Sequence, residues 1–121
     1  MFNKPGVVHI ANSTTDIMSE TFEDMCREVV HPMFEGQRTA GIDGNHSKPP
    51  KESGHYYGRS DDYGFTGRHV ITREPIEIPP DKRNIIAMKA QRHLDSMWGQ
   101  GEFVVILEAT HFHFQRKKGS V

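Results

Sequence analysis

The chain has 121 residues, with 15 basic and 16 acidic side chains and a formal net charge of -1. This length predicts one domain with one core, over residues 1–121, with 116–121 as a mobile basic tail. The near-zero charge excludes the broad positive field that binds nucleic acid or an anionic membrane. A single cysteine excludes an internal disulfide, whereas eight histidines make a bound metal a candidate for stiffening a loop-rich chain.

The N-terminal half contains one predicted helix. A short strand is predicted around residues 7–10. Candidate N-cap residues then precede a run that predicts a helix over 15–30, closed before Pro32. Its apolar residues recur at helical spacing: Met18, Phe22, Met25 and Val29. Glycine, serine, proline and charged residues dominate 36–54, which predicts a loop.

The C-terminal half contains a second predicted helix between extended segments. Val70 and Ile71 predict a strand, and Ile76 and Ile78 an extended apolar ridge. A second helical pattern begins at the prolines of residues 79–80 and ends at Gly99. Ile86, Ala90 and Met97 recur on one side of this helix, and either His93 or Leu94 completes that side. Met97 and Trp98 are expected to lie in the core.

Two strands complete the predicted fold. Residues 102–108 predict a buried strand. In residues 110–116, aromatic and polar side chains alternate, which predicts a strand with Phe112 and Phe114 on one face and two histidines on the other. The order of elements predicts an α+β fold in which two helices pack on a small antiparallel sheet.

Two separated stretches, SGHYYGRSDD and EATHFHFQ, contain candidate metal ligands within polar sequence. A catalytic zinc site needs three protein ligands and one open position. His55 and Asp62 supply two ligands, and the face that bears His111 and His113 supplies at least one more. Glu108 is close enough in sequence to take a proton from the metal-activated water.

The spacing of these residues makes geometric demands. The first two ligands are an odd number of residues apart, so we expect a bend at Gly58. Glu108 and His111 are also an odd number apart, so we expect a turn or bulge at 109–110. Spacing alone is equally compatible with scattered surface histidines, and Asp62 also fits an Asx turn.

Both stretches resemble the motifs of a known family. SGHYYGRSDD resembles the motif SxHxxGxAxD, and EATHFHFQ resembles the motif ExxHxH. Both motifs are typical of the zinc D-Ala-D-Ala carboxypeptidases and L-alanyl-D-glutamate endopeptidases. This family includes VanX, VanY and small phage endolysins. DGNHS at 43–47 is similar to the segment that precedes the first motif in small phage members. The resemblance covers residues 36–115 and implies a hedgehog/DD-peptidase-like α+β fold.

The resemblance implies roles for individual residues. Zinc would be bound by His55, Asp62 and His111, with Glu108 as the catalytic general base. The residues expected to contact substrate or to support the ligands are Ser53, Tyr57, His113 and Arg38. Arg38 would match an arginine that stabilises the oxyanion, although QRTAG departs from the family's usual context there. Asp61 competes with Asp62 as a ligand, and the alignment of the motif favours Asp62.

The function implied is that of a zinc-dependent peptidoglycan peptidase. A zinc-bound water would attack the D-Ala–D-Ala or L-Ala–D-Glu bond of stem peptides. Without a signal peptide or membrane span, such a chain is expected to be phage-encoded, made in the host cytoplasm and active at the cell wall, with stem peptides and other virion proteins as partners. We expect no nucleic-acid binding and no membrane insertion.

Two other classes of function stay open. One is an inactive zinc-binding protein that docks on the cell wall or within a phage tail or baseplate. Glu108 argues against it, because a structural metal needs no base. The other is a histidine-rich binder of metal or nucleic acid, which the near-zero charge disfavours.

Overall fold

The computed structural model describes residues 13–40 and 59–117, and it shows a mixed α+β arrangement. This confirms the predicted fold class at that level. The helices are α1, Thr14–Val29, and α2, Pro80–Trp98. The strands are β1 Phe34–Glu35, β2 Arg38–Ala40, β3 Ser60–Gly64, β4 Thr66–His69, β5 Pro75–Glu77, β6 Phe103–Leu107 and β7 His111–Arg116.

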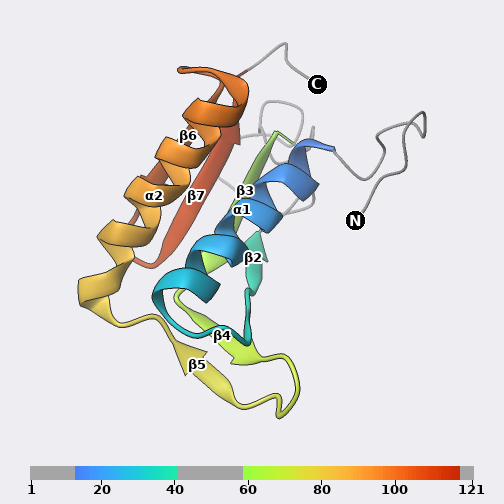
Figure 1. The fold of residues 1–121 in the computed structure, drawn as a ribbon, viewed down its shortest axis with the longest axis vertical. Helices are drawn as coiled ribbons and strands as arrows, with labels where there is room; N and C mark the ends of the chain where they lie inside the picture. The colour runs from blue at the N-terminus through green and yellow to red at the C-terminus, as the bar shows by residue number, and fades with distance from the viewer. Residues whose placement is uncertain (1–12, 41–58, 118–121) are drawn as a thin grey trace.

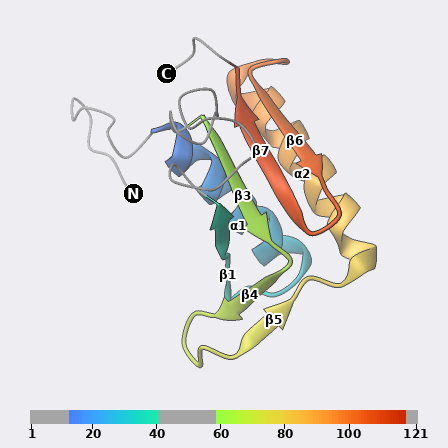
Figure 2. The same ribbon diagram turned by 180° about the vertical axis from the view of Figure 1, so that it is seen from behind.

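The strands form two small antiparallel sheets. One has the order β1-β4-β5 and the other the order β2-β3-β7-β6. Figure 1 looks onto the two helices, which cover one face of the four-stranded sheet. Figure 2 shows the opposite face of this sheet, which the helices leave uncovered. Hereafter the first is the helix face and the second the outer face.

Both helices begin and end within one residue of the predicted positions, since the first is predicted over 15–30 and spans Thr14–Val29. The Ser13 hydroxyl accepts a hydrogen bond from the Asp16 amide, which satisfies one of the free N–H groups at the start of α1. Pro80 is the first residue of α2, and Gly99 ends it with φ of 99°, a left-handed conformation that favours glycine. Lys89 on α2 forms an ion pair of 2.8 Å with Glu28 on α1, which adds a polar contact to the packing between the helices.

Phe22 of α1 is the centre of the core. Its ring stacks on Tyr63 of β3 at 4.6 Å between ring centroids. It also contacts Phe34, Phe112 and Phe114, and all three rings are fully buried. The first helix is therefore attached to both sheets through one aromatic cluster.

Two predicted segments differ from the structure. The predicted loop 36–54 contains β2 within its described part, because Arg38–Ala40 pairs with β3. The predicted strand at Val70 and Ile71 is a turn, and Ile71 is 69% exposed. The cause is local: Nδ1 of His69 accepts hydrogen bonds from the amides of Ile71 and Thr72, which closes the loop after β4. The predicted strand at 7–10 lies outside the described residues.

Burial also departs from expectation on the C-terminal side. The strand predicted as buried, β6, is an edge strand with Val104 and Ile106 exposed. Met97 and Trp98 are exposed rather than in the core, since the buried side of α2 is formed by Ile86, Ala87, Ala90 and Leu94. The alternation predicted for β7 is confirmed, because Phe112 and Phe114 are fully buried and the histidines are not.

Arg116 was expected to begin a mobile basic tail, but it is the buried last residue of β7. Its guanidinium lies 2.7 Å from the Glu102 carboxylate and donates to the Thr14 hydroxyl at 2.9 Å. It also lies over the rings of Trp98 and Phe103. These contacts join the end of the last strand to the first turn of α1.

No helix in the described ranges is both long and apolar enough to cross a lipid bilayer.

Replacing Phe22 by alanine should lower the free energy of unfolding by about 3–5 kcal/mol, because it opens a cavity among four aromatic rings. Ile71→Ala removes an exposed side chain of the turn after β4 and should change this free energy by less than about 0.5 kcal/mol. Urea denaturation followed by circular dichroism measures both. Equal effects of the two substitutions would contradict the core assignment.

The only cysteine, Cys26, is fully buried in α1, and burial raises the pKa of its thiol. We expect alkylation of the native protein to be far slower than that of a small free thiol, because modification must wait for opening of the helix. In concentrated urea, one thiol per chain should react rapidly. Fast native labelling would show that α1 does not pack as described.

Candidate metal and catalytic site

Strand β3 separates two neighbouring aspartates onto opposite faces of the sheet. In the pairing with β7, Asp61 is opposite Phe114, whereas Asp62 is opposite His113. Because side chains alternate along a strand, Asp61 lies on the helix face with the phenylalanines and Asp62 on the outer face with the histidines. All five residues of β3 are buried, so this polar stretch is a central strand of the sheet.

The second motif forms a tight hairpin between β6 and β7. The Glu108 amide donates a backbone hydrogen bond of 2.9 Å to the His111 carbonyl, and Ala109 and Thr110 form the turn between them. The predicted turn at 109–110 is therefore confirmed. A two-residue turn brings its flanking residues side by side, which explains how Glu108 and His111 meet despite their odd spacing.

The side chains of both motifs converge on His111. Its Nε2 lies 3.6 Å from Oδ2 of Asp62 and 3.7 Å from Oε1 of Glu108. Its other ring nitrogen, Nδ1, lies 2.9 Å from the Thr110 hydroxyl. This contact orients the ring so that Nε2 faces the two carboxylates.

His113 holds the other oxygen of Asp62. Its Nδ1 lies 2.7 Å from Oδ1 of Asp62, and its Nε2 lies 3.1 Å from Oε1 of Gln115. The hydrogen bond to Asp62 raises the pKa of His113, with Gln115 and Glu108 acting in the same direction and burial opposing them. Since both ring nitrogens face acceptor oxygens, the protonated imidazolium satisfies both contacts.

The site is half buried, with a gradient toward solvent. The Asp62 side chain is 7% exposed and that of His111 25%, whereas that of Glu108 is 44% exposed. The carboxylate at the turn therefore reaches water, while the carboxylate on β3 is fixed within the sheet.

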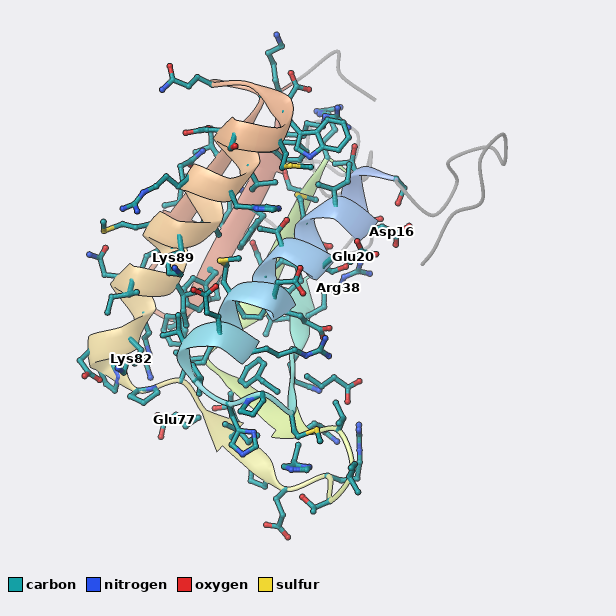
Figure 3. The ribbon with its side chains drawn as sticks, in the orientation of Figure 1. Asp16, Glu20, Arg38, Glu77, Lys82 and Lys89 are labelled. Atoms are coloured by element: carbon teal, nitrogen blue, oxygen red, sulfur yellow. The ribbon has the colours of Figure 1, made fainter. Side chains whose placement is uncertain are left out.

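Arg38 and Asp61 form a separate pair on the helix face. The Arg38 guanidinium lies 3.0 Å from Oδ2 of Asp61, and the Tyr63 hydroxyl donates to the same oxygen at 3.0 Å. Burial raises the pKa of Asp61, and Arg38 and Tyr63 oppose the shift. Figure 3 shows Arg38 on the side of the molecule that α1 covers. The structure thus does not bring Arg38 to Asp62 and His111.

The described residues fit part of a zinc site. Two ligands bound to tetrahedral zinc at about 2.0–2.1 Å lie roughly 3.3–3.4 Å apart, close to the 3.6 Å between His111 Nε2 and Asp62 Oδ2. Within 13–40 and 59–117, no group of three or more histidine, cysteine, aspartate or glutamate side chains is arranged to hold a metal. The expected third ligand, His55, lies outside these ranges, as do Ser53, Tyr57 and Gly58.

Two side-chain contacts of the candidate site are not predicted by the sequence motifs. Thr110 and Gln115 contact the imidazoles of His111 and His113. Gln115 could have been found, because it follows His113 by two residues and therefore shares its face of β7. Thr110 could not, because a turn residue has no such periodicity.

Comparisons with models of protein families, with curated proteins and with solved structures gave no match.

Proposed function

We propose that this chain is a zinc-dependent peptidase acting on peptidoglycan stem peptides, with the hedgehog/DD-peptidase-like fold that its motifs resemble. The observation that carries the proposal is the convergence of Asp62 and Glu108 on Nε2 of His111 from separate segments. A metal ligand set with a nearby free carboxylate is the arrangement that metal-assisted hydrolysis needs.

His111 and Asp62 would hold the zinc, with His55 as the third ligand that the motif supplies. When bound, the zinc supplies a Lewis acid that polarises the scissile carbonyl and acidifies water. His113 and Thr110 hold the two ligand side chains in place through Oδ1 of Asp62 and Nδ1 of His111. Each ligand therefore keeps one donor atom directed toward the other.

Glu108 has the proton-transfer role in this proposal. Its carboxylate accepts a proton as the water oxygen attacks the carbonyl carbon of the peptide bond. It then donates that proton to the amine nitrogen as the C–N bond breaks, which yields a carboxylate and an amine. Its position on a turn, with 44% of the side chain exposed, gives it access to both atoms.

Zinc binding should depend on Asp62 and not on Asp61. Asp62→Asn removes the negative charge of one proposed ligand and His111→Ala removes the imidazole of another, so each should weaken Zn²⁺ binding by more than about 100-fold, beyond the loss typical of supporting residues. Asp61→Asn is the matched control, because it makes the same chemical change one residue away on the helix face. Competition with a chromogenic chelator measures these affinities.

His93→Ala serves as a second control, since this histidine is exposed on α2. Equal loss of zinc affinity in the Asp61 and Asp62 variants would contradict the assignment of ligands. Absence of Zn²⁺ binding by the unsubstituted chain would overturn the metal site itself.

Glu108→Gln should lower hydrolysis of purified cell walls by roughly 10²–10⁴-fold while leaving zinc affinity within a few-fold, because it removes the base and keeps the size of the side chain. A chelator should abolish the activity of the unsubstituted chain, and added Zn²⁺ should restore it. Mass spectrometry of the released muropeptides identifies the bond that is cut. Zinc binding without any turnover would instead favour the structural, wall-docking alternative.

A further inference from the structure

A groove lies next to the candidate site, where the two sheets meet. Its volume is about 610 Å³, within the range typical of small-molecule and peptide sites. It is lined by residues from β3, β4 and β5 and from the segments between them, together with Gln37 and Thr39 from β2 and the residue before it. The lining includes Thr39, Gly64, Phe65, Arg68, Arg73 and Pro75.

The groove opens on the outer face, beside His111. Gly64 lines it and is paired directly with His111 across β3 and β7. Gly64 also follows Asp62 by two residues, so both positions face the same side of the sheet. A Cβ atom at Gly64 would lie 3.0 Å from the Thr39 side chain, so the glycine keeps this end of the groove open.

The charge of the groove is positive. Among the described residues that line it, only Arg68 and Arg73 are charged. Arg73 is already paired with the Glu35 carboxylate at 2.6 Å. In the part of the chain that the structure describes, no ion pair engages Arg68, which leaves its guanidinium as the cation that faces the groove.

We propose that this groove binds a carboxylate of the stem peptide, with Arg68 as its anchor; this inference rests on the proposed function. A guanidinium presents parallel N–H donors that match a carboxylate, and partial burial strengthens such a pair. Phe65 and Pro75 provide apolar surface for the neighbouring aliphatic part of the peptide. Stem peptides carry free carboxylates on D-Glu and on the terminal D-Ala, and either has this chemistry.

Binding of a defined peptide to the Glu108→Gln chain tests the anchor without turnover. The probe is L-Ala-D-Glu-L-Lys-D-Ala-D-Ala, in the free form and with either the D-Glu or the terminal carboxylate converted to an amide. Arg68→Gln should raise the Kd of the free peptide roughly 10- to 100-fold, as expected for loss of a charge-assisted hydrogen-bonded pair. Isothermal titration calorimetry on the zinc-loaded protein measures this.

The amidated probes identify which carboxylate occupies the groove. Amidation of that carboxylate should weaken binding to the Arg68-containing chain by a similar factor, and Arg68→Gln should then have little further effect. Amidation of the other carboxylate should leave the effect of Arg68→Gln unchanged. If Arg68→Gln alters the binding of all three probes equally, the proposed anchor is overturned.

Two further variants control for charge and folding. Arg92→Gln removes an exposed arginine on α2 and should leave every Kd unchanged. Arg68→Lys keeps the charge but loses the planar fork, so its Kd should lie between those of the unsubstituted chain and Arg68→Gln. An Arg68→Gln chain that binds like Arg92→Gln would refute the inference.

The outcomes for the anchor and for the proposed function are separable. Selective peptide binding that depends on Arg68, without hydrolysis of cell walls by the chain that retains Glu108, would support the groove and refute the peptidase. Hydrolysis with no dependence on Arg68 in KM or Kd would support the peptidase and refute the anchor.

Discussion

The pairing of β3 with β7 is the constraint on which the candidate site depends. It places Asp62 opposite His113 and Gly64 opposite His111, while Asp61 and Tyr63 meet the phenylalanines of the core. A shift of one residue would exchange the faces, so that Asp61 would meet the histidines and Tyr63 would leave the aromatic cluster. The aromatic packing of Tyr63 and Phe112 against Phe22 therefore fixes the register that places Asp62 and His111 on the outer face.

Placing two aspartates in a central strand is costly unless both find partners, because burial disfavours a charged carboxylate. Asp62 meets this demand through His113 and His111. Asp61 does so through Tyr63 and Arg38, but its Oδ1 has no hydrogen-bond partner within the described residues. Departures from good core composition are common at functional sites, and among the described strands β3 has the most buried polar residues: Ser60, Asp61 and Asp62.

The features that the sequence predicts depend on neighbouring residues, whereas those that it does not predict depend on contacts between residues far apart in the chain. Helix α1, helix α2 and the alternation of β7 follow from local periodicity, and the turn at 109–110 follows from the spacing of two residues. The burial of Asp61 and Asp62 could not be predicted, because it results from strands β2 and β7 flanking β3 in space. Arg116 is similar: its partners Thr14 and Trp98 are distant in sequence, so a basic residue near the terminus suggested a tail.

The change of sheet after β3 explains why a groove lies beside the candidate site. Gly64 donates to the Gln37 carbonyl at the end of one sheet, and Phe65 accepts from Ile78 as the chain enters the other. At Gly67 a Cβ atom would collide with the ring of Phe34, so glycine allows β1 to lie close against β4. The proposed catalytic residues thus lie on the paired strands and their hairpin, whereas the groove is formed by the junction. Because different residues fix the two parts, substitutions at the junction can alter the affinity for a peptide while the proposed zinc ligands keep their geometry.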